Sequence, residues 1–316
     1  MRVIEGSAAF ADAKLRRPVV TIGNFDGIHR GHQAILATVV SRARALSAPA
    51  VVYTFEPHPR KVLRPDSAPA LLTTLEQKLE LIAATGVDAV VLEAFTPEFA
   101  RTAPDVFVRE CLHRRLAPQE VYVGYDFHFG RDREGSMRLL TELGPRLGFA
   151  VTIIPEVEVD EGDVNSTRIR QCLADGEPER AARMLGRAYS VRGKVVRGDE
   201  RGRGLGFPTA NLEPENEVLP AAGVYAGTLR LLDDGDPAKG TVLRAVTNVG
   251  RRPTFAGESL RAEAHALDWS GDLYGRRVEI TFELRLRAER RFENVDALRR
   301  QIAADVDEAR RRLAAS

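Results

Sequence analysis

The sequence predicts an α/β protein with a doubly wound parallel sheet in its N-terminal part, followed by a small antiparallel β-barrel with a C-terminal helix. Up to residue 155, short apolar runs alternate with helix-like stretches, which is typical of a parallel sheet covered on both faces. From residue 189 onward, strand-like runs follow one another closely, separated by Gly, Pro and Asp, as in small barrels. The length of 316 residues also favours two domains. We therefore predict domains at residues 1–186 and 187–316.

Each predicted element follows from the spacing of its apolar residues. The expected strands of the N-terminal part are 18–22, 50–55, 87–92, 120–123 and 149–154. The expected helices there are 31–46, 75–85, 104–116 and 137–147, with a closing pair at 166–174 and 178–185. In the C-terminal part the expected strands are 190–196, 223–232, 242–249, 261–267 and 277–286, followed by a helix over 294–313.

Composition and charge narrow the class of protein. Apolar residues make up 44% and charged residues 29%, as in an ordinary globular protein. With 46 basic and 45 acidic residues the formal charge is +1, so we expect no nucleic-acid partner. No apolar run approaches the roughly 18 residues that span a bilayer, so we expect no membrane partner. Two cysteines exclude a disulfide scaffold, and we expect a cytoplasmic protein, a monomer or weak homo-oligomer, that binds small molecules.

The segment 23–32, Gly-Asn-Phe-Asp-Gly-Ile-His-Arg-Gly-His, carries the sharpest chemical signal of the N-terminal part. A strand ends before it and a helix begins near Gly31, which puts His29 and His32 at the carboxyl edge of the sheet, where ligands bind in such folds. Free N–H groups and the helix dipole attract phosphate there, and Gly31 lets a nucleotide approach the backbone. The alternatives are two surface histidines, or a metal site that lacks a third ligand at the usual spacing.

The segment 202–211, Gly-Arg-Gly-Leu-Gly-Phe-Pro-Thr-Ala-Asn, carries the second signal. Its glycine-rich half is weak, since it lacks the Gly-Lys-Ser/Thr of a Walker A loop and the strand–helix setting of a dinucleotide fingerprint. The Thr209 hydroxyl and the Asn211 carbonyl stand two residues apart on an extended segment, so they point to the same side. Hard oxygen ligands of this kind suit Mg²⁺ beside a nucleotide. The alternative is a turn stabilised by these two side chains.

Three further motifs accompany segment 23–32, namely Phe-Glu-Pro-His-Pro at 55–59, Gly-Tyr-Asp-Phe-His-Phe-Gly at 124–130 and Ser-Thr-Arg-Ile-Arg at 166–170. Together they resemble the flavin-adenylylating branch of the nucleotidyltransferase superfamily. The resemblance implies that His29, His32 and Arg168 stabilise charge on the nucleotide phosphates, and that Phe55 and Pro57 contact the flavin. It also implies nucleotide or phosphate contacts for Gly23, Asn24, Phe25, Asp26, Gly31, Asp126, Ser166 and Thr167. Asn165 and His128 depart from the family pattern, where Ser and Arg are usual.

The C-terminal part combines Phe-Pro-Thr-Ala-Asn with the segments 223–227, 248–255, 263–265, 273–275 and 287–292, and this set resembles the riboflavin kinase family over most of 189–313. The resemblance implies that Thr209 and Asn211 hold the metal and phosphates and that Glu263 is the general base. It also implies phosphate contacts for Gly202, Gly204 and Gly206, and flavin contacts for Arg287 and Phe292. Since Ala288 replaces the Asp of the family pattern, we expect Arg287 to be oriented less firmly.

Both resemblances together imply a bifunctional riboflavin kinase/FAD synthetase that uses ATP, riboflavin and FMN as substrates, forms FMN and FAD, and needs Mg²⁺. An alternative keeps the N-terminal enzyme and makes the barrel a flavin-sensing module without catalysis. The triad of Thr209, Asn211 and Glu263 argues against it, since a pure binder has no use for a base. A tRNA-handling enzyme related through His-x-Gly-His is a third hypothesis, which the near-neutral charge of both halves disfavours.

Overall fold

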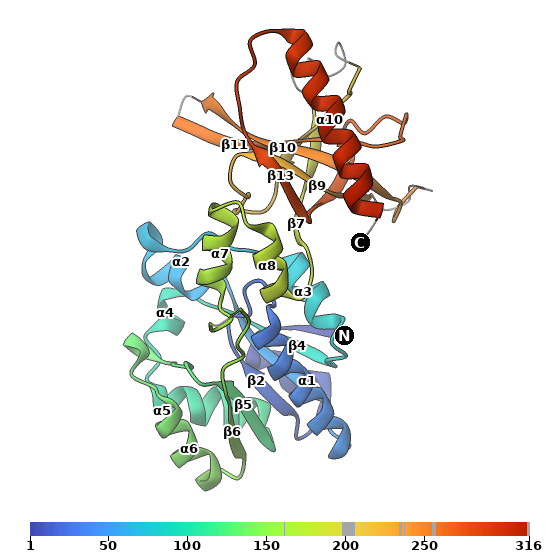
Figure 1. Ribbon diagram of the computed structural model, residues 1–316. Helices are drawn as coiled ribbons and strands as arrows, with labels where there is room; N and C mark the ends of the chain where they lie inside the picture. Colours follow the sequence, from blue (N-terminus) through green and yellow to red (C-terminus); the bar gives the residue numbers. More distant parts are fainter. Residues whose placement is uncertain (161, 198–205, 234–235, 237, 255–256, 315–316) are drawn as a thin grey trace. The chain divides into compact units, whose positions relative to one another are not determined.

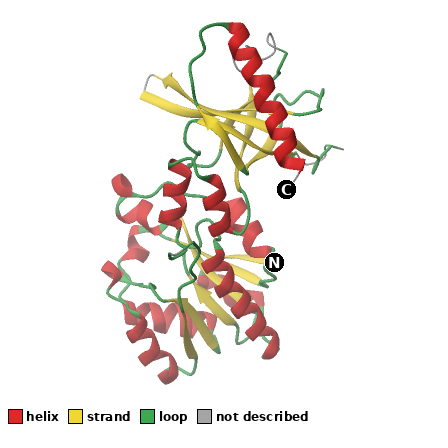
Figure 2. Ribbon diagram, viewed as in Figure 1, coloured by secondary structure: helices red, strands yellow, loops and turns green. Residues whose placement is uncertain are grey.

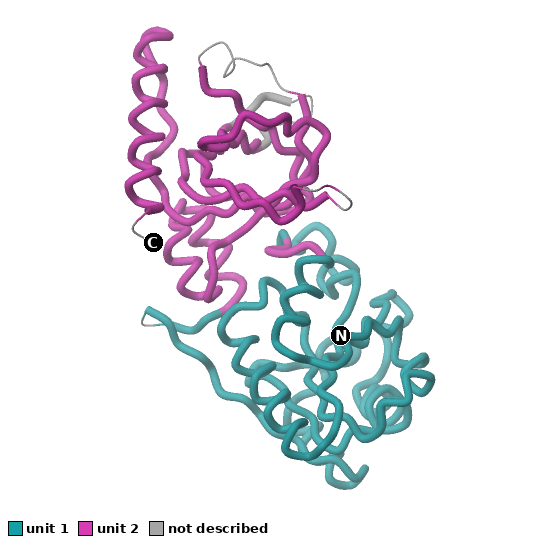
Figure 3. The backbone as a smooth tube through the Cα atoms, turned by 90° about the vertical axis from the view of Figure 1, so that its right-hand side faces the viewer, with its two compact units in different colours: residues 1–70, 75–164 teal, residues 71–74, 165–316 magenta. Residues whose placement is uncertain are grey.

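The computed structural model describes residues 1–160, 162–197, 206–233, 236, 238–254 and 257–314, with the backbone alone at 251–254 and 257–259 (Figure 1). The chain forms two compact units (Figure 3). The first comprises residues 1–70 and 75–164, and the second comprises residues 71–74 and 165–316. Each unit has its own sheet, and the predicted α/β architecture is confirmed.

The first unit is built on a sheet of six strands in which all neighbours run parallel. The strands are β1 (Arg2–Glu5), β2 (Val19–Ile22), β3 (Ala50–Glu56), β4 (Ala89–Ala94), β5 (Glu120–Gly124) and β6 (Ala150–Ile154). Their order is β1-β4-β3-β2-β5-β6. Inner strands such as β2 are buried along their whole length, which is why the sequence predicts them as apolar runs. The edge strand β1 is not predicted, because Ile4 is its one buried residue.

Helices cover both faces of this sheet (Figure 2). One face packs on η1 and η3 and on α6, and the other packs on α1 and α3. The helical segments of the first unit are η1 (Ser7–Ala13), α1 (Arg30–Ala45), α2 (Pro59–Leu63), η2 (Pro65–Ser67), α3 (Leu75–Ala83), α4 (Pro97–Ala100), α5 (Pro104–Val106), η3 (Phe107–Leu116), η4 (Arg131–Arg133) and α6 (Met137–Arg146). The predicted helix 104–116 is thus a short α-helical turn that continues as the π-helix η3.

The second unit contains a closed antiparallel barrel. Its strands are β7 (Tyr189–Val196), β8 (Ala210–Pro214), β9 (Gly223–Leu231), β10 (Val242–Thr254), β11 (Gly257–Ala266), β12 (Arg277–Phe282) and β13 (Leu284–Ala288). Six strands follow the order β10-β11-β8-β7-β12-β9, and β9 closes the ring by pairing with β10. Strand β13 continues the edge of β12 along β9. Close packing of β9 against β12 requires Gly227, since a Cβ there would lie 2.1 Å from the carbonyl oxygen of Thr281.

Among its described residues, the second unit also contains the helices α7 (Ser166–Ala174), α8 (Pro178–Leu185) and α10 (Val295–Ala314). Helix α10 buries Val306 and Ala309 against the barrel strands. The helix pair α7 and α8 is bonded to the barrel, for example through the Arg285 backbone N–H, which donates to Glu179 at 3.0 Å. Packing therefore divides the chain after Val164, whereas the boundary between two catalytic domains near residue 186 stays a prediction.

Candidate active sites

The loop between β2 and α1 brings His29 and His32 into contact. His29 is the N-cap of α1, and its Nδ1 accepts a long hydrogen bond of 3.4 Å from the backbone N–H of His32. The two imidazole rings stack with their centroids 3.6 Å apart and their planes inclined by 19°. A Cβ at Gly31 would lie 3.2 Å from the His29 ring, so glycine leaves the room that this arrangement needs. Both histidines thus lie at the helix N-terminus, as the sequence predicts.

The backbone that leads to the histidines is held in an unusual conformation. Phe25 and Ile28 have φ angles of 53° and 39°, in the left-handed region that bulky side chains avoid. Both side chains are about 1% exposed, so core packing stabilises the strained turn. The edge of the Phe25 ring also packs on His32, with centroids 5.1 Å apart. The position of the His32 ring is therefore fixed before any ligand binds.

The His32 side chain is electrostatically unusual. Burial, and then the neighbouring His29, lower the pKa of His32 well below its ordinary value, so the imidazole is neutral at neutral pH. Its Nδ1 atom is buried and has no hydrogen-bond partner within the described part of the chain. A buried polar atom without a partner is costly, which makes this nitrogen a natural point of contact for a ligand.

The other residues predicted for the N-terminal site lie at the same edge of the sheet. Gly23 and Asn24 follow β2, Phe55 and Pro57 lie at the end of β3, and Asp126 follows β5. Strand β2 lies between β3 and β5, and the strand order reverses its direction between β2 and β5. Ligands of open α/β sheets bind at such a switch point, beyond the carboxyl ends of the strands. Three motifs far apart in the sequence thus meet where a nucleotide would bind.

Two of these residues also have structural roles. Phe55 is 9% exposed, and its ring packs against those of Phe95 and Phe99, with centroids 5.8 and 6.1 Å apart. Asp126 is exposed in the turn after β5, and the Nδ1 atom of His128 lies 2.9 Å from its backbone oxygen. The flavin contact of Phe55 and the nucleotide contact of Asp126 stay predictions.

Lys78 also lies at this edge, although none of the sequence motifs contains it. It lies on α3 and is 7% exposed, and its Nζ atom is 3.5 Å from the Glu56 carboxylate and 3.5 Å from the Phe55 carbonyl oxygen. Burial lowers the pKa of Lys78, while Glu56 and Asp26 oppose this change. The ammonium group thus faces motif 23–32 and motif 55–59 together. A signal exists in the sequence: Lys78 stands four residues before the buried Ile82, on the face of α3 that packs on the sheet.

The motif Ser-Thr-Arg-Ile-Arg at 166–170 opens α7. Asn165 is its N-cap, and the side-chain oxygen accepts a hydrogen bond of 2.9 Å from the backbone N–H of Arg168. Asn165 therefore does what the usual serine would do at this position. Ser166 and Thr167 form the first turn together with Arg168, and all three belong to the second compact unit.

A row of polar residues crosses three strands of the barrel. Glu263 on β11 pairs in register with Asn211 on β8 and with Asn248 on β10. Residues directly opposite in antiparallel strands point to the same face, so the three side chains share one side of the sheet. The neighbours Ala262 and Ala264 are fully buried on the other face. The structure thus brings the predicted base next to the predicted metal ligand and adds Asn248.

The segment before β8 is attached to this row. The Nδ1 atom of His265 lies 2.8 Å from the Pro208 carbonyl oxygen, and the Phe207 ring packs edge-on against His265. Asn211 is 6% exposed, and its Oδ1 atom is buried without a hydrogen-bond partner among the described residues. This unpartnered amide oxygen, two residues after Thr209 in the sequence, fits a hard divalent cation such as Mg²⁺. Gly206 is exposed with φ +88°, whereas Gly202 and Gly204 lie outside the described residues.

Comparison with known proteins now identifies the chain. The family model described as FAD synthetase matches residues 11–168, and the model described as riboflavin kinase matches residues 185–313. The bifunctional riboflavin kinase/FMN adenylyltransferase of Escherichia coli K12 is 39% identical over 96% of both chains. The enzyme of the same name from Pseudomonas fluorescens is 42% identical over 92% of both chains. The chain belongs to the bifunctional riboflavin kinase/FMN adenylyltransferase family.

A solved structure is similar to this chain in fold. It is titled a macrolide-efflux protein from Streptococcus pneumoniae, is 31% identical, and superposes with a TM-score of 0.86 over 98% of this chain and 99% of that one. In the described part of the present chain, none of the helices combines the length and apolar character that a membrane crossing requires. Nor do three His, Cys, Asp or Glu side chains gather into a metal-binding group there.

Arg287, the predicted flavin contact of the riboflavin kinase part, is held more firmly than the sequence predicts. Its guanidinium donates to both carboxylate oxygens of Asp305 on α10, at 2.8 to 3.0 Å. Asp305 is in turn bonded to Gln301 at 2.7 Å. The expectation that Ala288 leaves Arg287 loosely oriented is therefore wrong, because α10 supplies the missing carboxylate. Phe292 lies beside this pair, with the Arg287 guanidinium 5.6 Å from its ring centroid.

Proposed function

We propose that the protein makes FAD in two steps, phosphorylating riboflavin in the barrel and adenylylating FMN at the N-terminal sheet. The observation that carries the first activity is the row of Asn211, Glu263 and Asn248. The observation that carries the second is the stacked pair of His29 and His32 at the switch point of a parallel sheet. The names of the relatives support both activities, and the flavin-sensing alternative is not favoured.

In the adenylyl transfer, an FMN phosphate oxygen attacks the α-phosphorus of ATP. The new P–O bond forms as the bond to the β-phosphate breaks, and pyrophosphate leaves. The phosphate is already anionic and needs no base, so positioning and charge stabilisation supply the catalysis. We assign charge stabilisation to His29 and His32, and we assign a cation for the departing phosphates to Arg168. Neutral His32 either donates one N–H or takes up a proton as the anion arrives, since a nearby negative charge raises its pKa.

In the kinase reaction, the Glu263 carboxylate accepts the proton of the primary alcohol of riboflavin as that oxygen attacks the γ-phosphorus of ATP. The products are FMN and ADP. Thr209 and Asn211 would hold Mg²⁺. A bound Mg²⁺ would neutralise part of the negative charge on the triphosphate. Arg287 and Phe292 would contact the flavin, and the Asp305 carboxylate fixes the Arg287 guanidinium for this task.

If the two reactions take place at separate sites, a substitution at one site should stop one reaction and leave the other intact. His29→Ala with His32→Ala should abolish FAD formation while FMN accumulates from riboflavin and Mg-ATP. Glu263→Gln should abolish FMN formation while supplied FMN is still converted to FAD. Chromatography of flavins over time measures both steps at once. If either variant stops both reactions in a folded protein, the assignment is wrong.

We propose that the enzyme works in the cytoplasm, where its two free, buried thiols Cys111 and Cys172 stay reduced. We also propose that it acts as a monomer or weak homo-oligomer without a nucleic-acid partner. Sedimentation equilibrium measures the oligomeric state. Oligonucleotide binding at several salt concentrations tests the absence of a nucleic-acid partner.

A further inference from the structure

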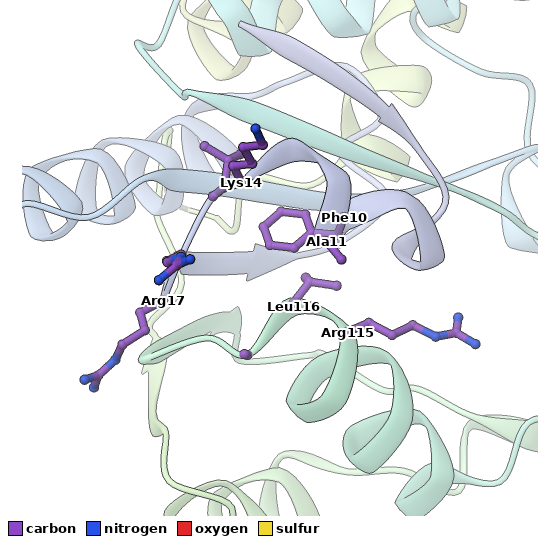
Figure 4. Close-up of a pocket in the computed structure, with 9 residues that line it drawn as sticks. Phe10, Ala11, Lys14, Arg17, Arg115 and Leu116 are labelled. Atoms are coloured by element: carbon purple, nitrogen blue, oxygen red, sulfur yellow. The ribbon is translucent and has the colours of Figure 1, made fainter.

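A hollow of about 620 Å³ lies in the first unit, away from the residues assigned to catalysis (Figure 4). Its walls come from the chain just before β2, from η1 and from the end of η3, just before β5. Because strands β2 and β5 run parallel, these segments meet at the amino edge of the sheet, opposite the edge that holds His29 and His32. The hollow is thus separate from the adenylyltransferase site.

The rim of this hollow is basic and its charges are uncompensated. Lys14, Arg16, Arg17 and Arg115 line it, and the residues that line it include no acid. Nowhere in the described residues does any of these four make an ion pair, although Arg115 donates to the Ser7 hydroxyl at 2.9 Å. Some other arginines of this unit form ion pairs, and one example is the bidentate contact of Arg42 with Glu120. Four cations without counter-charges around one cavity favour a multiply charged anion.

The inner wall of the hollow is apolar and rigid. The side chains of Phe10 and Leu116 are 2% and 1% exposed, and they lie between Lys14 and Arg115 in Figure 4. A residue that does not line the hollow holds the backbone of the rim, since the Gln119 side chain donates a hydrogen bond of 2.8 Å to the Arg17 carbonyl oxygen. A ligand would therefore find its contacts already in place.

We propose that this hollow binds a phosphorylated small molecule with a planar ring, a nucleoside phosphate or a flavin nucleotide, at a second site distinct from the two catalytic sites. The volume is in the range of small-molecule pockets, which is about 300–1,000 Å³. The guanidinium groups match phosphate oxygens in bidentate geometry, and the ring would pack on Leu15 and Ala11, the accessible apolar residues of the lining that Phe10 and Leu116 support from behind. A nucleic acid would need a long basic stripe to follow its phosphates, and the basic residues here surround one cavity.

Equilibrium binding to the full chain tests the proposal. The probes are ATP, FMN and inorganic tripolyphosphate, each added alone. The variant Arg16→Glu with Arg17→Glu reverses two rim charges, and Ala11→Trp fills the hollow without changing charge. The matched control is Arg109→Glu with Arg146→Glu, which reverses two exposed arginines of the same unit that do not line the hollow.

We expect wild type and control to bind one more equivalent of ATP or of FMN than the two rim variants, or to bind that equivalent at least tenfold more tightly. The nucleotide that shows the difference identifies the ligand class. Both activities should persist in the rim variants, because the changed residues lie outside the catalytic sites. Equal binding by all four proteins would overturn the proposal. Binding of tripolyphosphate as tight as that of the nucleotides would overturn the role of the ring, and rim-dependent binding of an oligonucleotide alone would overturn the small-molecule assignment.

Discussion

Replacing Lys78 tests whether the buried ammonium group positions the two motifs that it contacts. Lys78→Met removes the charge and keeps the length of the side chain, so Glu56 and Asp26 lose a cation that faces both of them. We expect the kcat/KM for FAD formation to fall while riboflavin phosphorylation in the other unit stays unchanged. FMN should therefore accumulate when riboflavin and Mg-ATP are supplied.

The geometry sets the magnitude of this effect. A separation of 3.5 Å between Lys78 and Glu56 corresponds to about 5 kcal/mol at an effective dielectric constant of about 20. Solvent screens part of this, because the Glu56 side chain is 35% exposed, and about 2 kcal/mol remains as a working value. Since each 1.4 kcal/mol is about a tenfold change, kcat/KM should fall about 30-fold.

The assay compares steady-state rates of both reactions in wild type, Lys78→Met, Lys78→Arg and the control Lys194→Met, which changes an exposed lysine of the barrel. Lys78→Arg keeps the charge and should recover part of the lost rate, which a purely steric role would not allow. An unchanged rate of FAD formation in folded Lys78→Met would refute the reasoning. An equal loss of both activities would also refute it, since that result indicates global damage.

Three further outcomes follow from the described contacts. Because the pKa of His32 is lowered in the folded state, the unfolded chain binds more protons than the folded chain below about pH 6.5. As the pH falls below this value, the free energy of unfolding should therefore decrease more steeply in wild type than in His32→Gln. Denaturant titration at several pH values measures this difference. Asp305→Asn should raise the KM for riboflavin about tenfold by removing a charge-assisted bidentate contact, and FAD formation and the exposed control Asp307→Asn should be unaffected. Gly227→Ala should lower the stability of the barrel unit by about 3 kcal/mol or more, since its Cβ has no space, and calorimetry would show whether it does.

The sequence predicts the inner strands and the larger helices because burial determines their composition. The α7 and α8 ranges are predicted to the residue, and β5 to within one residue. What escapes prediction has little burial of its own: β1 contributes a single buried residue, and the short helices α2 and α4 bury none. The sequence predicts β8 only as an extended segment around Thr209 and Asn211, because Asn, Glu and Pro, which are uncommon in strands, make up three of its five residues.

The histidine pair and the polar residues of the barrel are predictable because their motifs are continuous in the sequence. Lys78, Asn248 and Asp305 are not predicted, because each acts through a residue on another element. Lys78 meets Glu56 across a helix and a strand, and Asp305 meets Arg287 from the C-terminal helix. The spacing of Lys78 to Ile82 places Lys78 on the buried face of its helix, but the partners of all three residues depend on strand order and helix packing, which no local pattern of the sequence contains.

Polar atoms that the fold buries without a partner connect stability with function in both units. His32 Nδ1 and Asn211 Oδ1 are two such atoms among the described residues, and they lie in the two predicted sites. Each unsatisfied atom costs the folded state about 1–3 kcal/mol. A ligand that bonds to such an atom removes this cost. The hydrogen bond that is missing in the ligand-free chain therefore favours binding of the ligand. The same reasoning explains why burial keeps His32 neutral until an anion arrives, since a charge there would be stable only beside a phosphate.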